Sequence, residues 1–156
     1  MMPVESFTRM ISAVTAGIAG QPLDAMLEAR LNQEYPAAGE FFITLHNACA
    51  DAIAAGWMCR QGEGPRKFGR ILQPGAATHG FSVDVVDITD LAGPHHRHPT
   101  GEIDMVMPLT AGALFDGRGE GWLVYPPGSA HRPTVGGGRA LILYLLPKGE
   151  IEFTGT

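Results

Sequence analysis

The sequence has few basic residues, only two cysteines and no long hydrophobic run. Its 156 residues include 11 Lys and Arg against 16 Asp and Glu, which gives a formal net charge of -5 at pH 7. No cluster of Lys and Arg is present that could bind a phosphate backbone, so we expect no nucleic-acid binding. No apolar stretch approaches the roughly 20 residues that a transmembrane helix requires, so we expect no membrane insertion.

The two cysteines, Cys49 and Cys59, are too few to form a disulfide framework. We interpret them as buried thiols that behave as small hydrophobic side chains. The first ten residues, MMPVESFTRM, lack the basic segment and apolar core of a secretory signal, so we expect a cytoplasmic protein.

The amino-acid composition and the spacing of apolar residues change near Gly56. This change predicts two parts, a helical segment over 1–56 and a β-rich domain over 57–156. In the first part, apolar residues recur at three- and four-residue spacing, and alanine, leucine and glutamate are frequent, as is typical of helices. In the second part, glycine and proline separate short segments rich in β-branched and aromatic residues. These segments are WMCR, KFGRIL, GFSVDVVDI, EIDMVMPL, ALF, GWLVYP and RALILYLL. Seven short strands of this kind predict an antiparallel sandwich or barrel.

Three of the six histidines lie within the four residues from 95 to 98. In an extended segment, residues two apart point the same way, so His96 and His98 share one face, and His95 lies on the other. A short turn would bring Glu102 to the same place, and the turn in YPPGSAH would deliver His131. Three imidazoles and a carboxylate form a plausible site for a divalent metal such as Zn, Fe, Mn, Ni or Co.

This arrangement resembles the cupin superfamily. The first cupin motif, HxH followed three or four residues later by Glu, corresponds to HRHPTGE at 96–102, and the second, PxG with a later His, corresponds to PPGSAH at 126–131. The glycine at the head of each motif does not fall at the usual spacing. The resemblance implies a double-stranded β-helix, or jelly-roll barrel, with His96, His98, Glu102 and His131 as metal ligands. Some cupins keep the fold without binding metal.

The β half, from GPHHRHPTGEIDMVMP to the C-terminal GGGRALILYLLPKGEIEF, is similar to a narrower group, the 4-hydroxylaminobenzoate lyases, which bacteria use to degrade 4-nitrobenzoate. This similarity implies conversion of 4-hydroxylaminobenzoate and water to protocatechuate and ammonia. The metal could polarise the hydroxylamine oxygen or supply hydroxide, and a metal-free acid–base mechanism stays open. Two alternatives are an Fe(II)-dependent cupin dioxygenase and a cupin that binds a small molecule without turnover.

Strand alternation and chemistry suggest further residues of an active site. The carboxylates Glu102 and Asp104 share one face and are candidate catalytic groups, as is the phenol of Tyr144. An arginine would bind the carboxylate of an aromatic acid. The candidates are Arg132, Arg70 and Arg97 for the carboxylate, Trp122 and Tyr125 for ring contacts, and His79 for the pocket wall. We also expect a homodimer that buries an edge strand or an apolar sheet face.

Overall fold

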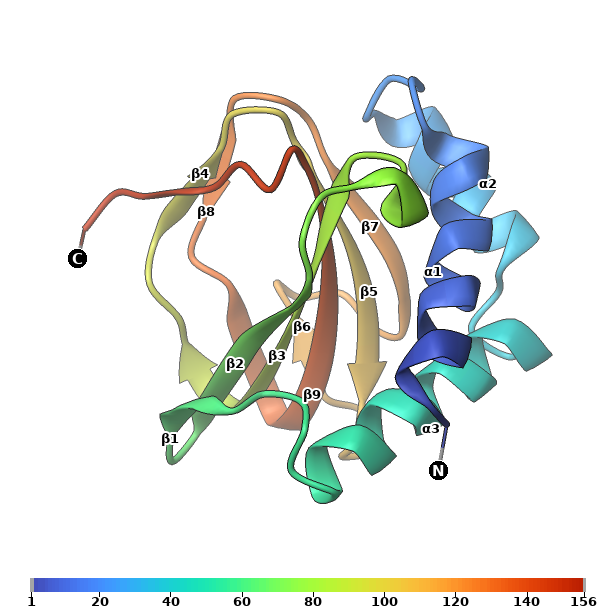
Figure 1. Ribbon diagram of the computed structural model, residues 1–156. Coiled ribbons are helices and arrows are strands. Elements are labelled where there is room, and N and C mark those ends of the chain that lie inside the picture. Colours follow the sequence, from blue (N-terminus) through green and yellow to red (C-terminus); the bar gives the residue numbers. More distant parts are fainter. Residues whose placement is uncertain (1, 156) are drawn as a thin grey trace.

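The computed structural model describes residues 2–155, and three helices precede the strands along the chain (Figure 1). The helices are α1 (Val4–Ile18), α2 (Ala25–Glu34) and α3 (Glu40–Ala54). Helix α2 begins after Asp24, whose side chain accepts a hydrogen bond from the Leu27 backbone N–H and so caps the first turn. The helical segment predicted for the N-terminal third of the chain is confirmed.

The strands form two antiparallel sheets. The larger sheet has the order β1-β2-β3-β9-β5-β7, with β6 pairing to β9, and the smaller sheet has the order β10-β4-β8. The strands of the larger sheet are β1 (Gln61–Glu63), β2 (Arg66–Leu72), β3 (Phe81–Ala92), β5 (Glu102–Pro108), β6 (Leu114–Phe115), β7 (Gly121–Tyr125) and β9 (Thr134–Pro147). Those of the smaller sheet are β4 (His96–His98), β8 (Ser129–His131) and β10 (Glu152–Phe153). A short 3-10 helix, η1 (Ala76–Thr78), lies between β2 and β3.

The chain passes repeatedly between the two sheets. It runs from β3 in the larger sheet to β4 in the smaller one, back to β5, and later from β7 through β8 to β9. This alternation, together with the neighbours β3-β9-β5-β7 in one sheet and β4-β8 in the other, is the connectivity of a jelly roll. The prediction of a mainly β, cupin-type double-stranded β-helix with an N-terminal helical segment is therefore confirmed.

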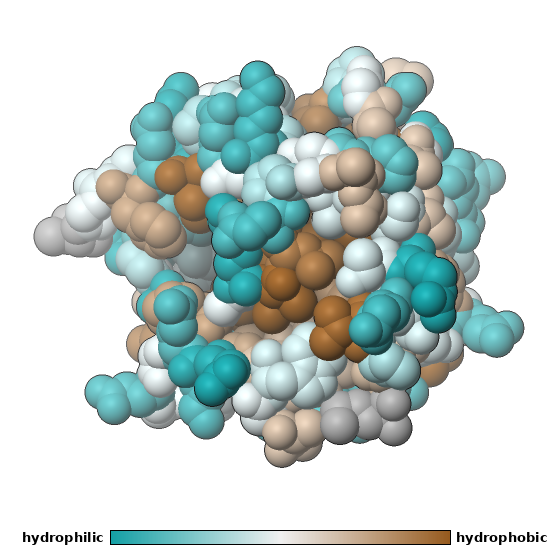
Figure 2. All heavy atoms as spheres, in the orientation of Figure 1, coloured by the Kyte–Doolittle hydropathy of each residue, from teal (hydrophilic) through white to brown (hydrophobic). Residues whose placement is uncertain are grey.

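The two faces of the larger sheet pack against different layers. Helices cover one face, and the smaller sheet lies on the other side (Figure 1). Because side chains alternate along a strand, Leu143 joins the core shared with the helices, whereas Ile142 and Tyr144 point into the space between the sheets. Figure 2 shows hydrophobic side chains gathered at the centre of one face of the molecule, framed by hydrophilic ones. The helices and the larger sheet thus share one hydrophobic core, and the division into a helical segment over 1–56 and a β-barrel domain over 57–156 stays a prediction.

Both cysteines are free thiols and buried. Burial raises the pKa of Cys49 to about 12 and likewise that of Cys59 to about 12. This agrees with the interpretation of the two cysteines as packing residues. Within residues 2–155, none of the helices has the length and hydropathy needed to cross a membrane.

Candidate metal centre

The four predicted ligands lie at the ends of three strands that meet between the sheets. His96 and His98 are the ends of β4, and His131 ends β8, directly opposite His96 in the antiparallel pair. Glu102 is the first residue of β5. The turn before it depends on Gly101, which has φ of +90°, and an added Cβ there would lie 2.6 Å from Leu23 Cδ2. Only glycine fits this close approach, and it lets the chain turn so that Glu102 faces the histidines.

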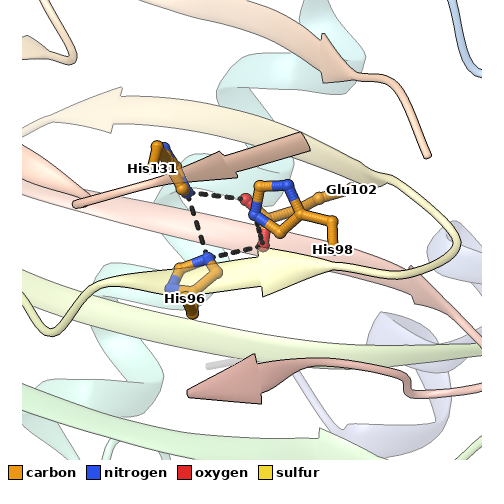
Figure 3. Close-up of side chains that lie close together, drawn as sticks. All are labelled: His96, His98, Glu102 and His131. Atoms are coloured by element: carbon orange, nitrogen blue, oxygen red, sulfur yellow. Dashed lines mark hydrogen bonds and ion pairs between the residues drawn. The ribbon is translucent and has the colours of Figure 1, made fainter. Parts of the chain in front are cut away.

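The ligand atoms of these four side chains all lie within 4.8 Å of one another. The Nε2 atoms of His96 and His131 are 3.0 Å apart. Glu102 Oε1 lies 3.4 Å from His96 Nε2 and 3.3 Å from His98 Nε2, and Oε2 lies 3.5 Å from His131 Nε2. Figure 3 shows the imidazole nitrogens and the carboxylate turned toward one shared point. The sequence prediction that these residues converge therefore agrees with the structure.

The polar atoms at this point have too few partners within the described chain. Both carboxylate oxygens of Glu102 and the Nε2 of His98 are buried without a hydrogen bond of normal geometry, although ion-pair distances are met. A buried polar group without a partner is costly and uncommon. Three imidazoles and one carboxylate are also the donors that borderline divalent ions prefer. These residues therefore fit a metal ion.

The protonation states follow from the close packing of acids and imidazoles. Burial alone would raise the pKa of Glu102, but the neighbouring histidines hold that pKa well below its ordinary value. Burial lowers the pKa of His131, but the carboxylates of Asp116 and Glu102 outweigh this effect and raise it to about 9. A metal that binds His131 near neutral pH must therefore displace a proton.

Asp116, which the sequence analysis did not identify as a site residue, orients His131 from behind. Its Oδ2 lies 2.6 Å from His131 Nδ1 and accepts a hydrogen bond of 2.6 Å from the Tyr125 hydroxyl. Its Oδ1 accepts a hydrogen bond from the Thr134 backbone N–H. A carboxylate bonded to the outer ring nitrogen of a metal-binding histidine fixes the tautomer and directs Nε2 to the metal. The Asp-Gly hairpin signal at Asp116 was visible in the sequence, but its link to His131 depends on the fold.

We expect Asp116→Asn to weaken metal binding by about 10- to 100-fold, because the amide keeps the size of the side chain but loses the charge that orients His131. The measurement is competition against a chelator of known affinity. Asp90→Asn is a matched control, since Asp90 also has a positive φ and accepts a backbone N–H, from Gly138. Equal metal affinities for the two variants would contradict the assigned role.

Asp104 and Tyr144 lie beside the metal centre, on the face predicted for them. They are paired across β5 and β9, and the His96 and Tyr144 rings have centroids 6.3 Å apart. The carboxylate oxygens of Asp104 and the hydroxyl of Tyr144 are buried without hydrogen-bond partners in the described chain. Burial, and then the negative charge of Glu102, raise the pKa of Asp104 well above its ordinary value. Both groups can therefore hold a proton at neutral pH.

A cavity of about 210 Å³ adjoins the centre and is largely apolar. Its walls include Phe68, Val86, Ile88, Pro94, His96, Pro133, Tyr144, Ile151 and Phe153. In the view of Figure 2, the surface is recessed at the left, between the C-terminal segment and the β1–β2 hairpin. The cavity has the apolar lining of a small-molecule site, and His96 of the candidate metal centre is part of its wall.

The three arginines considered for the substrate carboxylate all have other partners. Arg70 lines the cavity, but its guanidinium forms a two-pronged pair with Asp84, at 2.9 and 3.2 Å. Arg132 donates to the Gly93 carbonyl oxygen and is not among the lining residues of this cavity. Arg97 points away from the metal ligands and pairs with Glu152.

Trp122 and His79 lie outside the cavity. Trp122 is buried on the helical face of the sheet, where its Nε1 donates to the Tyr35 carbonyl oxygen and its ring meets Phe42 edge to face. His79 has φ of +51° after η1, and its Nδ1 lies 2.9 Å from Thr15 Oγ1 of helix α1. The left-handed turn interrupts the strand alternation on which the expected position of His79 depended.

The sequence comparisons with known proteins agree on one family. A profile of the 4-hydroxylaminobenzoate lyase family matches residues 9–153. Curated proteins with that name are 34% identical in Nocardioides sp. (strain LMS-CY), over 81% of this chain and 80% of the relative, and 30% identical in Pseudomonas putida, over 88% of each.

Among solved structures, the chain is similar to oxalate oxidase in complex with the substrate analogue glycolate, at 25% identity and a TM-score of 0.45, over 60% of this chain and 57% of that one. It is also similar to a protein of unknown function with a cupin-like fold from Ralstonia eutropha JMP134, at 17% identity and a TM-score of 0.40, over 55% of this chain and 57% of that one. The extent of the family match and the identity to its named members show that this chain belongs to the 4-hydroxylaminobenzoate lyase family.

Proposed function

We propose that this protein is a lyase that converts 4-hydroxylaminobenzoate and water to protocatechuate and ammonia, with a divalent metal held by His96, His98, Glu102 and His131. The observation that carries the proposal is the convergence of these four side chains beside an apolar cavity, in a chain that belongs to this family. The substrate class of such a site is a small aromatic hydroxylamine. A compound of this kind is formed by partial reduction of an aromatic nitro acid, and we therefore propose that the reaction belongs to nitrobenzoate breakdown.

The reaction is balanced without an external oxidant. The N–O bond breaks, an oxygen atom becomes bonded to the neighbouring ring carbon, and water replaces nitrogen on the ring as ammonia leaves. The two electrons that the ring loses are taken up by the breaking N–O bond. When bound, a divalent ion supplies Lewis acidity toward the departing oxygen.

The protein's own groups orient the substrate and move protons. The apolar walls hold the ring and exclude bulk water, which strengthens electrostatic interactions inside the cavity. Tyr144, whose buried hydroxyl has no partner in the described chain, is positioned to donate a hydrogen bond to the departing hydroxyl group. Asp104 lies opposite Tyr144 in the sheet and is a second proton donor in reach of the same region.

The test is incubation of the metal-loaded protein with 4-hydroxylaminobenzoate under anaerobic conditions. We expect protocatechuate and ammonia in equal amounts, measured by chromatography and an enzymatic ammonia assay. Product formation only with oxygen would instead indicate the dioxygenase reaction that the same ligands allow. Stoichiometric binding without any product would indicate a non-catalytic binding protein.

We also propose that the protein acts in the cytoplasm as a homodimer. Two free, buried cysteines suit a reducing compartment. Strand β1 has exposed residues throughout and forms one edge of the larger sheet, and such edges are commonly covered by a second copy. Analytical ultracentrifugation measures the mass in solution, and a monomer at micromolar concentration would contradict the dimer.

A further inference from the structure

Arg66 is a cationic side chain in the wall of the cavity. It lies at the start of β2, half-buried, and lines the cavity together with Phe68 and Arg70. Its guanidinium lies 4.2 Å from the centroid of the Phe68 ring. Among residues 2–155 it has neither a hydrogen bond nor an ion pair, whereas Arg70 in the same wall is occupied by Asp84. A fixed guanidinium with free N–H groups in an apolar cavity is an anion-binding group.

The position of Arg66 suits one end of an elongated ring compound. In the antiparallel pair of β2 and β3, Phe68 lies opposite Val86, and Arg70 lies opposite Asp84. Asp84 in turn lies opposite Tyr144 in β9. The guanidinium stacked on Phe68 is therefore displaced from the level of Tyr144 by two residues along the strand, about 7 Å. The cavity thus has a cation toward one end and a metal ligand and a phenol toward the other.

The stacking on Phe68 also limits where the guanidinium can go. Cation–π attraction holds the guanidinium over the Phe68 ring, and a guanidinium can donate two parallel hydrogen bonds from one edge. At the end of the cavity near Arg66 lie Gly93 and Pro133, and Arg66 Nε is 3.8 Å from where a Cβ of Gly93 would be. A Cβ at position 93 would lie 3.1 Å from Pro133 Cγ and 3.2 Å from the Pro133 carbonyl oxygen, so the glycine allows close packing against Pro133 beside the guanidinium.

We propose that Arg66 binds the carboxylate of the aromatic substrate and so determines specificity for para-substituted benzoates. This inference rests on the proposed function, and it assigns a role to a residue that was not among the candidate arginines. A para-substituted ring carries its carboxylate and its hydroxylamino group at opposite ends. With the carboxylate on Arg66, the ring lies between the apolar walls, and the hydroxylamino group is directed toward the metal centre and Tyr144.

The test is isothermal titration calorimetry of the metal-loaded protein with two probes of similar size, 4-hydroxybenzoate and 4-hydroxybenzamide. These probes differ in the charge of the group that Arg66 is proposed to bind. We expect Arg66→Gln to weaken 4-hydroxybenzoate binding by about 10- to 100-fold, because a charge-assisted hydrogen-bonded pair is lost, and to change 4-hydroxybenzamide binding less than about threefold. Arg66→Lys should recover part of the loss, since it keeps the charge but not the fork. Lys67→Gln, which removes one positive charge from an exposed neighbour on the same strand, should change neither affinity.

Equal binding of 4-hydroxybenzoate by wild type and Arg66→Gln would overturn the assignment, and so would an equal loss for both probes, which indicates a damaged cavity. The experiment distinguishes failure of the Arg66 assignment from failure of the proposed lyase activity. Selective, Arg66-dependent carboxylate binding without formation of protocatechuate would keep this inference and reject the lyase activity. Turnover of 4-hydroxylaminobenzoate with an unchanged KM in Arg66→Gln would do the reverse.

Discussion

Replacement of His131 by alanine is expected to abolish stoichiometric metal binding and to lower kcat by at least about a thousandfold. His131 Nε2 lies 3.0 Å from His96 Nε2 and 3.5 Å from Glu102 Oε2, so its loss removes one of four donors that share a single point. A bound metal stabilises the charge of a transition state by several kcal/mol, and each 1.36 kcal/mol corresponds to tenfold in rate. His96→Ala should behave in the same way. The measurements are metal content by plasma mass spectrometry and single-turnover kinetics.

His95→Ala is the matched control for the two ligand variants. His95 directly precedes His96 but is turned to the other side of the chain, where it contacts Thr154 near the C-terminus. We expect this variant to retain metal and most of the activity. The variants should also keep their circular dichroism spectra, because the fold is held by the two hydrophobic cores rather than by the four ligands. A wild-type protein without stoichiometric metal, with turnover preserved in both ligand variants, would refute the metal centre.

Trp122→Ala is expected to destabilise the protein by about 3–5 kcal/mol, as is typical of a large aromatic side chain lost from a core. The ring is 1% exposed and packs between the larger sheet and the helices. The substitution also removes the indole N–H that donates to the Tyr35 carbonyl oxygen. The measurement is urea unfolding followed by circular dichroism. Because the ring lies on the face of the sheet opposite the metal ligands, the folded variant should keep the KM of the wild type.

Met26→Ala provides the comparison for a surface position. Met26 is 81% exposed on helix α2, and its substitution should change the free energy of unfolding by less than about 0.5 kcal/mol. A raised KM in Trp122→Phe, together with an unfolding free energy close to that of the wild type, would contradict this assignment. It would indicate that Trp122 takes part in substrate binding.

The four residues of the candidate metal centre could be predicted from the sequence because most of the signal for them is local. HRHPTGE places two histidines on one face of a short strand and a carboxylate after a tight turn, and PPGSAH supplies the third histidine after another turn. Strand alternation then brings His96 and His98 together whatever the rest of the fold does. The change of composition near Gly56 likewise depends on local propensity, so the helices and the strands could be predicted separately.

The residues that line the cavity were harder to predict from the sequence, because their positions depend on the register between strands that are distant along the chain. Trp122 lies opposite Met105 rather than Asp104, which assigns it to the helical face. This pairing cannot be read from either strand alone. Arg66 stands near a glycine-rich turn with no motif around it, and its place in the wall of the cavity becomes visible only when β2 is paired to β3.

The central position of β9 limits how the length of this chain can vary. Tyr144 points into the space between the two sheets, and its neighbours Leu143 and Leu145 pack in the core under the helices. Deleting one residue between Gly138 and Tyr144, both within β9, would exchange these two sets, and leucine would occupy the place of the phenol. Gains and losses of residues among functional homologues are therefore expected outside β9 rather than within this strand.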